Sequence, residues 1–199
     1  IRSELMNRVL DLIGNTPIVR LKKVADGLNI FVKLDHLNPS GSIKDVMALY
    51  MVEKAEKKGL LKKGSKIIEV TTGNTGISFA MISAIKGYKF TAVMPEFIAK
   101  QKIDMIRAYG GEVVLTPAEE DIIGAVKRYK QMVEENPDAW LPNQFENLDN
   151  VEAHKEITGK EILRQLEGVE IDAFVAGVGT GGTLMGVASA LREVFPNVK

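Results

Sequence analysis

Short apolar runs rich in β-branched residues alternate along the chain with longer segments of helical period. In residues 44–58, the apolar positions recur at helical spacing between Glu and Lys, which favours an amphipathic helix over a strand. The same reasoning predicts helices over residues 4–12, 75–86, 100–109, 122–134, 151–165 and 181–194. It predicts strands at 18–21, 30–34, 66–70, 90–94, 112–115 and 173–176. The alternation predicts an α/β fold whose mostly parallel sheet carries helices on both faces.

The polar stretch 136–150 has little periodicity and is predicted to be a loop or a crossing between domains. The last predicted helix is followed only by residues 195–199, where a βα series would continue with another strand. The sequence is therefore expected to be part of a longer protein.

Composition excludes several classes of function. The chain has 199 residues, with 26 Lys plus Arg, 26 Asp plus Glu, two His and no Cys. A balanced charge argues against binding to nucleic acid or to an anionic membrane by bulk electrostatics. No run reaches the ~18 apolar residues of a membrane span. The absence of Cys excludes disulfides and thiolate ligands, and two isolated histidines make a metal site improbable, so no metal is expected.

A turn rich in Pro, Ser and Gly at residues 38–45 leads directly into a predicted helix. Ser42 is placed to cap that helix, and Lys44 falls in its first turn. A cation there faces the positive end of the helix dipole, which lowers the cost of losing its proton. The hypothesis is a neutral, nucleophilic amine at Lys44; the alternative is a solvated surface lysine.

A second motif lies between the predicted strand 66–70 and a helix. Its residues are Thr71, Thr72, Gly73, Asn74, Thr75 and Gly76. Three hydroxyls, an amide and free backbone N–H groups converge on a helix N-terminus, which suits a carboxylate or a phosphate. The alternative is an ordinary loop whose hydroxyls cap the helix.

A third motif, residues 177–183, follows the predicted strand 173–176 and precedes a helix. Its glycines let the backbone approach a ligand closely, and the helix start supplies N–H donors for a phosphate. Gly177, Gly179 and Gly182 also match the dinucleotide fingerprint, but its confirming acidic residue would fall near or beyond the chain end. Residues 143–147 are amide-rich and alone favour turn capping, and His36 and His154 favour local hydrogen bonding over general-base roles.

Five segments in this order resemble the cysteine synthase (O-acetylserine sulfhydrylase) and cystathionine β-synthase family of fold type II pyridoxal-phosphate enzymes. They are residues 13–21 (IGNTPIVRL), 38–45, 71–76, 144–145 and 179–183. The resemblance implies a three-layer αβα fold like that of the tryptophan synthase β-subunit. It further implies a large domain from residues 1–37 and 149–199, incomplete here, and a small mobile domain from residues 38–148.

The resemblance also implies a role for each matching position. Lys44 would form the internal aldimine with pyridoxal 5'-phosphate and shuttle the α-proton, and Asn74 would hydrogen-bond the ring's 3-oxygen. The phosphate would be held by Gly179, Thr180, Gly181, Gly182 and Thr183. The substrate carboxylate would be bound by Thr71, Thr72, Gly73, Thr75 and Gln144. The residue at the pyridine nitrogen would lie beyond residue 199.

The implied reaction is β-replacement on an O-activated L-serine through an aminoacrylate, with sulfide giving L-cysteine. The alternatives are a cystathionine β-synthase or serine/threonine dehydratase-like enzyme, and a non-catalytic phosphate- or nucleotide-binding fragment. The resemblance implies a homodimer and a serine acetyltransferase as partner, and the absence of disulfides favours a cytoplasmic location. Three positions depart from the family pattern: Val46 stands where Arg is frequent, Val70 where Pro is frequent, and Thr72 where Ser is frequent.

Overall fold

The computed structural model describes residues 9–24 and 27–199. The chain divides into two compact units, which are described separately: Ile1–Met47 with Leu148–Lys199, and Ala48–Asn147. Helix α1 (Lys44–Lys57) begins in the first unit and ends in the second. The domain boundaries expected from the sequence, after residues 37 and 148, remain a prediction.

A three-stranded parallel sheet forms the centre of the unit 48–147. Its strands are β3 (Lys66–Val70), β4 (Lys89–Pro95) and β5 (Glu112–Thr116), in the order β3-β4-β5. The central strand β4 is buried at every position after Lys89, as expected for a parallel strand covered on both faces. The three predicted strands of this unit are confirmed within one or two residues at each end.

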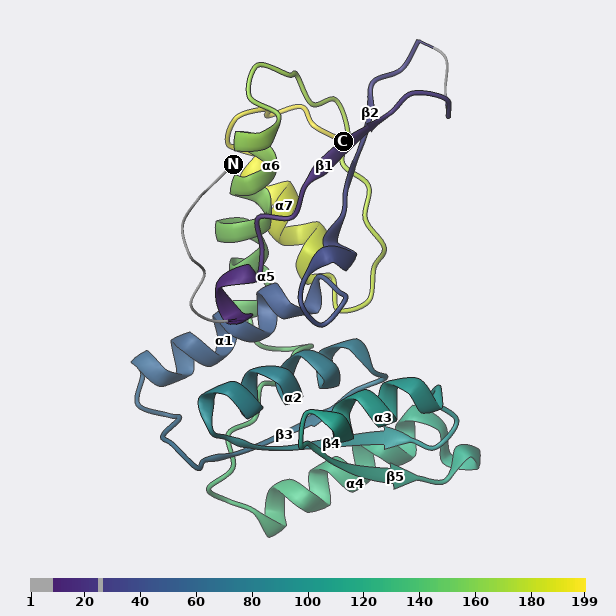
Figure 1. Cartoon of the computed structure of the whole chain (residues 1–199), viewed down its shortest axis with the longest axis vertical. Coiled ribbons are helices and arrows are strands. Elements are labelled where there is room, and N and C mark those ends of the chain that lie inside the picture. Colours follow the sequence, from purple (N-terminus) through teal and green to yellow (C-terminus); the bar gives the residue numbers. More distant parts are fainter. Residues whose placement is uncertain (1–8, 25–26) are drawn as a thin grey trace. The chain divides into compact units, whose positions relative to one another are not determined.

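Helices cover both faces of this sheet. Helices α2 (Asn74–Lys86) and α3 (Lys100–Ala108) lie on one face and α4 (Asp121–Glu135) on the other, with the short 3-10 turn η3 (Ala118–Glu120) before α4 (Figure 1). On the α4 face, Ala125 and Met132 pack against Ile68, Val70 and Val93. The predicted three-layer αβα arrangement is confirmed in this unit.

The loop after α4 runs along the outer edge of β3. Ile68 donates its backbone N–H to Trp140, and Trp140 donates to Lys66, which makes an isolated parallel bridge. The Trp140 ring also packs edge-on against Phe79 of α2, with ring centroids 6.2 Å apart. The predicted loop at 136–150 is therefore held to the sheet, and its last residues begin the next helix.

The other unit contains an antiparallel hairpin, β1 (Ile18–Leu21) with β2 (Ile30–Lys33), paired from Ile18↔Lys33 to Leu21↔Ile30. Both strands were predicted, but this pair departs from the parallel arrangement that the alternation favoured. The eight intervening residues, 22–29, are too few for the crossover that parallel neighbours need. The 3-10 turns η1 (Val9–Leu12) and η2 (Asp35–Leu37) flank the hairpin. The start of the helix predicted at 4–12 lies outside the described residues.

Besides the start of α1, the described residues of this unit form one long helical segment and one shorter helix. The long segment joins α5 (Asp149–Ala153), the π-helical turn η4 (His154–Gly159) and α6 (Lys160–Gln165). Helix α7 (Gly182–Arg192) packs closely on it, because a Cβ at Gly186 would lie 2.3 Å from the Val151 carbonyl oxygen. This close approach places the start of α7 beside residues 150–158. Among the described residues, no helix combines the length and apolarity needed to cross a bilayer.

The strand predicted at 173–176 is wrong: these residues form no strand, and Val175 is 90% exposed. In this part of the chain, the Phe174 N–H donates to the Lys199 carbonyl and the Lys199 N–H donates to the Asp172 carbonyl. A β-strand needs a continuous ladder with a neighbouring strand, and two bonds to the last residue do not provide one. The apolar run alone was therefore not enough to form the element.

Candidate active site

The loop before α1 is closed by hydrogen bonds that fix where Lys44 begins the helix. Ser42 Oγ accepts the backbone N–H of Lys44 at 3.2 Å, which confirms its predicted capping role. Asp45 is fully buried and accepts the backbone N–H of Ser40 at 2.7 Å together with the Ser40 hydroxyl. Asn38 accepts the backbone N–H of Gly14 at 2.8 Å, which ties the loop to the start of the hairpin.

Burial lowers the pKa of the Lys44 amine. The direction is the one predicted, but the identified cause is loss of solvation rather than the helix dipole. A lowered pKa increases the fraction of neutral amine, which is the nucleophilic form.

His154 is one residue of this site whose role sequence reasoning missed. Its ring is fully buried, with Nδ1 3.0 Å from the Thr158 hydroxyl and Nε2 3.3 Å from the Thr183 hydroxyl. Burial, and secondarily the charge of Lys44, lower the His154 pKa to about 4, so the imidazole is neutral at neutral pH. The expected local hydrogen bond is present, yet the ring also neighbours both Lys44 and the glycine-rich loop. The spacing of His154 and Thr158, four apart on one helical face, was the available signal.

The loop 177–183 leads into the N-terminus of α7 and has open space around several of its glycines. A Cβ at Gly177, Gly179 or Gly181 would meet no atom within 4 Å, and Gly181 has a φ of +82° that favours glycine. Gly182 differs, because its Cβ would lie 2.2 Å from Asn150 Oδ1. The loop therefore presents an open backbone surface at a helix start, which suits a phosphate group.

Asn150 holds this loop from the α5 side, a role the sequence did not reveal. Its Nδ2 donates to the Thr180 hydroxyl at 2.9 Å, and the same hydroxyl accepts the Gly182 backbone N–H at 3.3 Å. The dinucleotide fingerprint requires a strand directly before the loop, and residues 173–176 form none. The arrangement favours a single phosphate group over a dinucleotide.

The second motif forms its own polar cluster in the unit 48–147. Thr71 is buried, and its hydroxyl accepts the backbone N–H groups of Gly73 at 3.0 Å and Gly76 at 3.2 Å. The Thr71 hydroxyl therefore does cap the start of α2, and its role in carboxylate binding remains a prediction. Thr72 and Asn74 are exposed beside it, and Gly73 has a φ of +138° that only glycine adopts easily.

Gln144 joins this cluster across the sequence. Thr75 donates its hydroxyl hydrogen to Gln144 Oε1 at 2.7 Å, and Gln144 Nε2 donates to the Val70 carbonyl at 3.2 Å. Thr71, Thr75 and Gln144 are thus brought together, as the sequence predicted for a carboxylate site. Lys102 of α3 adds a cation there, donating from Nζ to the Thr72 carbonyl at 3.3 Å.

Comparison with known proteins identifies the family. Residues 9–199 match the model of the family described as pyridoxal-phosphate dependent enzyme. The chain belongs to this family. It is 47% identical over 196 residues to a cysteine synthase of Staphylococcus aureus, covering 98% of this chain and 63% of that protein. It is 48% identical over 192 residues to a probable cysteine synthase of Bacillus subtilis, covering 94% of this chain and 62% of that protein.

A solved structure supports the family assignment. The crystal structure of an O-ureido-L-serine synthase superposes with a TM-score of 0.94 at 43% identity, covering 98% of this chain and 62% of that one. The fold type II assignment is therefore confirmed, as is membership of a family of enzymes. The chain spans somewhat less than two thirds of the length of these relatives.

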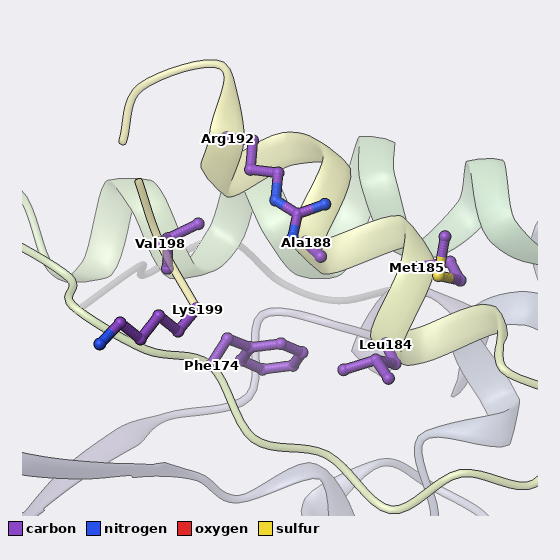
Figure 2. Close-up of a pocket in the computed structure, with 7 residues that line it drawn as sticks. All are labelled: Phe174, Leu184, Met185, Ala188, Arg192, Val198 and Lys199. Carbon is purple, nitrogen blue, oxygen red and sulfur yellow. The ribbon is translucent and has the colours of Figure 1, made fainter. Parts of the chain in front are cut away.

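The residues of the unit that holds Lys44 fit the family's cofactor, pyridoxal phosphate. An open glycine surface at a helix start matches its phosphate, and a half-buried amine with a lowered pKa matches its aldehyde. The pocket lined by Phe174, Leu184, Met185, Ala188, Arg192, Val198 and Lys199 contains none of the predicted site residues (Figure 2).

Proposed function

We propose that this chain carries the cofactor and substrate sites of a pyridoxal-phosphate enzyme that replaces the β-substituent of an O-activated L-serine. With sulfide as the incoming nucleophile the product is L-cysteine, as in a cysteine synthase. The observation that carries the proposal is the grouping of Lys44, His154 and the start of α7, in a chain about half identical to cysteine synthases.

Pyridoxal phosphate, when bound, supplies an electron sink for loss of the β-substituent. The chain's own residues bind and orient it: Gly179, Thr180, Gly181, Gly182 and Thr183 hold the phosphate, and Asn74 hydrogen-bonds the ring's 3-oxygen. Lys44 provides the amine that attaches the cofactor and then moves the α-proton of the substrate at Nζ. The lowered pKa suits both tasks, because each needs the neutral amine for part of the cycle.

Neutral His154 holds the Thr183 hydroxyl without adding a second positive charge beside Lys44. A charged imidazole would compete with the amine for a proton and raise the cost of each charged state. We therefore assign His154 to orientation rather than to proton transfer.

The substrate's α-carboxylate is bound by Thr71, Thr72, Gly73, Thr75 and Gln144. The start of α2 supplies backbone N–H groups, and the Thr75–Gln144 hydrogen bond fixes the amide at its edge. Closure of residues 71–76 over the substrate, within a mobile domain of residues 38–148, would exclude water from the reaction. A cytoplasmic homodimer that docks a serine acetyltransferase completes the proposal, on the strength of the family resemblance.

The test is a substrate panel on the pyridoxal-phosphate-loaded protein. O-acetylserine, O-phosphoserine, serine and threonine are each supplied with sulfide or with homocysteine. We expect the highest kcat/KM with an O-activated serine and sulfide, and its loss in Lys44→Ala. A rate with serine and homocysteine far above that with O-acetylserine and sulfide would instead favour the cystathionine β-synthase alternative.

A further inference from the structure

Glu69 is a buried carboxyl group that none of the roles above uses. It lies in β3, in the otherwise apolar sequence Ile67-Ile68-Glu69-Val70, and is only 1% exposed. An acid in such a place costs free energy unless its oxygens are hydrogen-bonded. The partners of this carboxyl group therefore indicate why it is there.

Both carboxyl oxygens of Glu69 accept backbone N–H groups. Oε1 accepts the N–H of Val70 at 3.1 Å, and Oε2 accepts the N–H of Gln144 at 3.3 Å. The backbone of Asn143 also hydrogen-bonds this carboxyl group. The group thus connects the end of β3 to the residue predicted to bind the substrate carboxylate.

The geometry of the neighbouring loop explains the need for an acceptor. Residues up to Trp140 pair with the outer edge of β3, but Asn143 turns away with a φ of +52°. Beyond that turn, the N–H of Gln144 and the N–H of Val70 are both donors, so they cannot bond each other. An ionised carboxylate offers an acceptor oxygen to each, whereas a glutamine amide would present an NH₂ to one of them.

We propose that Glu69 is the positioning residue of the carboxylate site: by holding the Asn143–Gln144 backbone it orients the Gln144 amide toward Thr75 and the substrate. The inference rests on the proposed function, because it takes Gln144 as a substrate contact.

The charge state of Glu69 provides a signal of its own. Burial raises its pKa to about 8, against the opposing effect of the backbone hydrogen bonds from Gln144, Val70 and Asn143. The facing titratable group on α4 is Tyr129, whose pKa is raised by burial and then by Glu69 and Glu146. The charged residue of α2 is Lys86, in its last turn, which pairs with Glu56 of α1. A proton therefore leaves this carboxyl group near pH 8, close to the Gln144 backbone.

The first measurement needs no substrate and begins with the unmodified protein. In ¹⁵N–¹H spectra of the protein, we expect the backbone and side-chain amide resonances of Gln144 to shift with pH, with a midpoint near 8. The shift should be absent in Glu69→Gln and retained in Glu112→Gln, a control that removes an exposed carboxylate from β5. Gln144 resonances that ignore pH in the unmodified protein would overturn the proposal even if Glu69→Gln failed to fold.

The second measurement separates positioning from mere stabilisation. For the pyridoxal-phosphate-loaded protein, Glu69→Gln should raise KM for the amino-acid substrate about tenfold while kcat stays within about twofold. A structural role alone would lower the active fraction, and so kcat, without changing KM. An unchanged KM in Glu69→Gln, with KM raised in Gln144→Ala, would refute the role of Glu69 and leave the proposed function intact. An unchanged KM in Gln144→Ala would refute the carboxylate role of Gln144 itself.

Discussion

The Thr75 hydroxyl donates a 2.7 Å hydrogen bond to Oε1 of Gln144, a residue 69 positions further along the chain. Both groups are buried, Thr75 at the start of α2 and Gln144 in the loop that follows the sheet edge. A buried hydroxyl–amide pair is stabilising only while both partners remain, because a lone partner keeps its desolvation cost. This bond therefore fixes which atoms of Gln144 face the helix start.

Removing the hydroxyl tests that bond. Thr75→Val keeps the shape of the side chain but leaves Gln144 Oε1 without this donor, so KM for the amino-acid substrate should rise about fivefold. The matched control is Thr91→Val in β4, which removes the 3.1 Å hydrogen bond to Glu112 away from the site. Steady-state kinetics of both variants give the two KM values. Equal KM values for Thr75→Val and Thr91→Val would contradict the assignment of Thr75 to the carboxylate site.

Lys44 is predicted to be the residue that attaches the cofactor. Borohydride reduction after incubation with pyridoxal phosphate, followed by peptide mass mapping, should give a single adduct at Lys44, because burial lowers the pKa of its amine. Lys44→Ala should abolish the adduct, and Lys57→Ala, at the other end of the same helix, should retain it. Adducts scattered over many lysines would argue against a specific site.

Substitutions of two glycines in the loop 177–183 should distinguish an effect on cofactor binding from an effect on stability. Gly179→Ala adds a methyl group where no atom lies within 4 Å, so we expect little change in thermal stability but weaker binding of pyridoxal phosphate. Gly182→Ala forces a methyl group against Asn150, and we expect a loss of about 1–3 kcal/mol in the free energy of unfolding as well. Thermal melts and cofactor titrations give both quantities. Normal cofactor affinity in Gly179→Ala would show that the phosphate binds elsewhere.

The sequence predicted secondary structure best where an element is determined by the pattern of its own residues rather than by a distant neighbour. Apolar period and caps located β3, β4, β5 and the helices around them, and the turn before Lys44 placed Ser42 correctly. The predicted strand at 173–176 failed because a strand also depends on a neighbour, which apolar character does not reveal. The antiparallel pairing of β1 with β2 was missed because the alternation of elements was given more weight than the short connection between the two strands.

The site residues that the sequence missed act through tertiary contacts. Thr71 and Thr75 were recognisable from their loop, and Gln144 only from the family resemblance. Glu69 and His154 lie in a strand and a helix whose sequence patterns indicate no functional role. Their roles become visible from burial and from partners distant in sequence, the Gln144 backbone and Thr183. For Glu69 the available signal was a polar residue in an apolar strand, which does not identify its partner.

Because folding keeps His154 neutral, the free energy of unfolding should depend on pH. Its pKa is about 4 in the folded protein, lowered first by burial and then by Lys44, and about 6.5 when unfolded. Between these values the unfolded chain binds more protons, so stability is full above pH 6.5 and is lost as the pH falls toward 4. The slope contributed by one group is at most about 1.4 kcal/mol per pH unit.

Denaturant unfolding across this range provides the measurement. The unmodified protein should lose stability between pH 6.5 and 4, and His154→Asn should lose part of that slope while keeping a polar side chain near Thr183. His36→Asn is the matched control, since His36 is exposed and its replacement should leave the slope intact. A slope that is the same in all three proteins would show that folding does not lower the His154 pKa, and would contradict the assignment of a neutral imidazole beside Lys44.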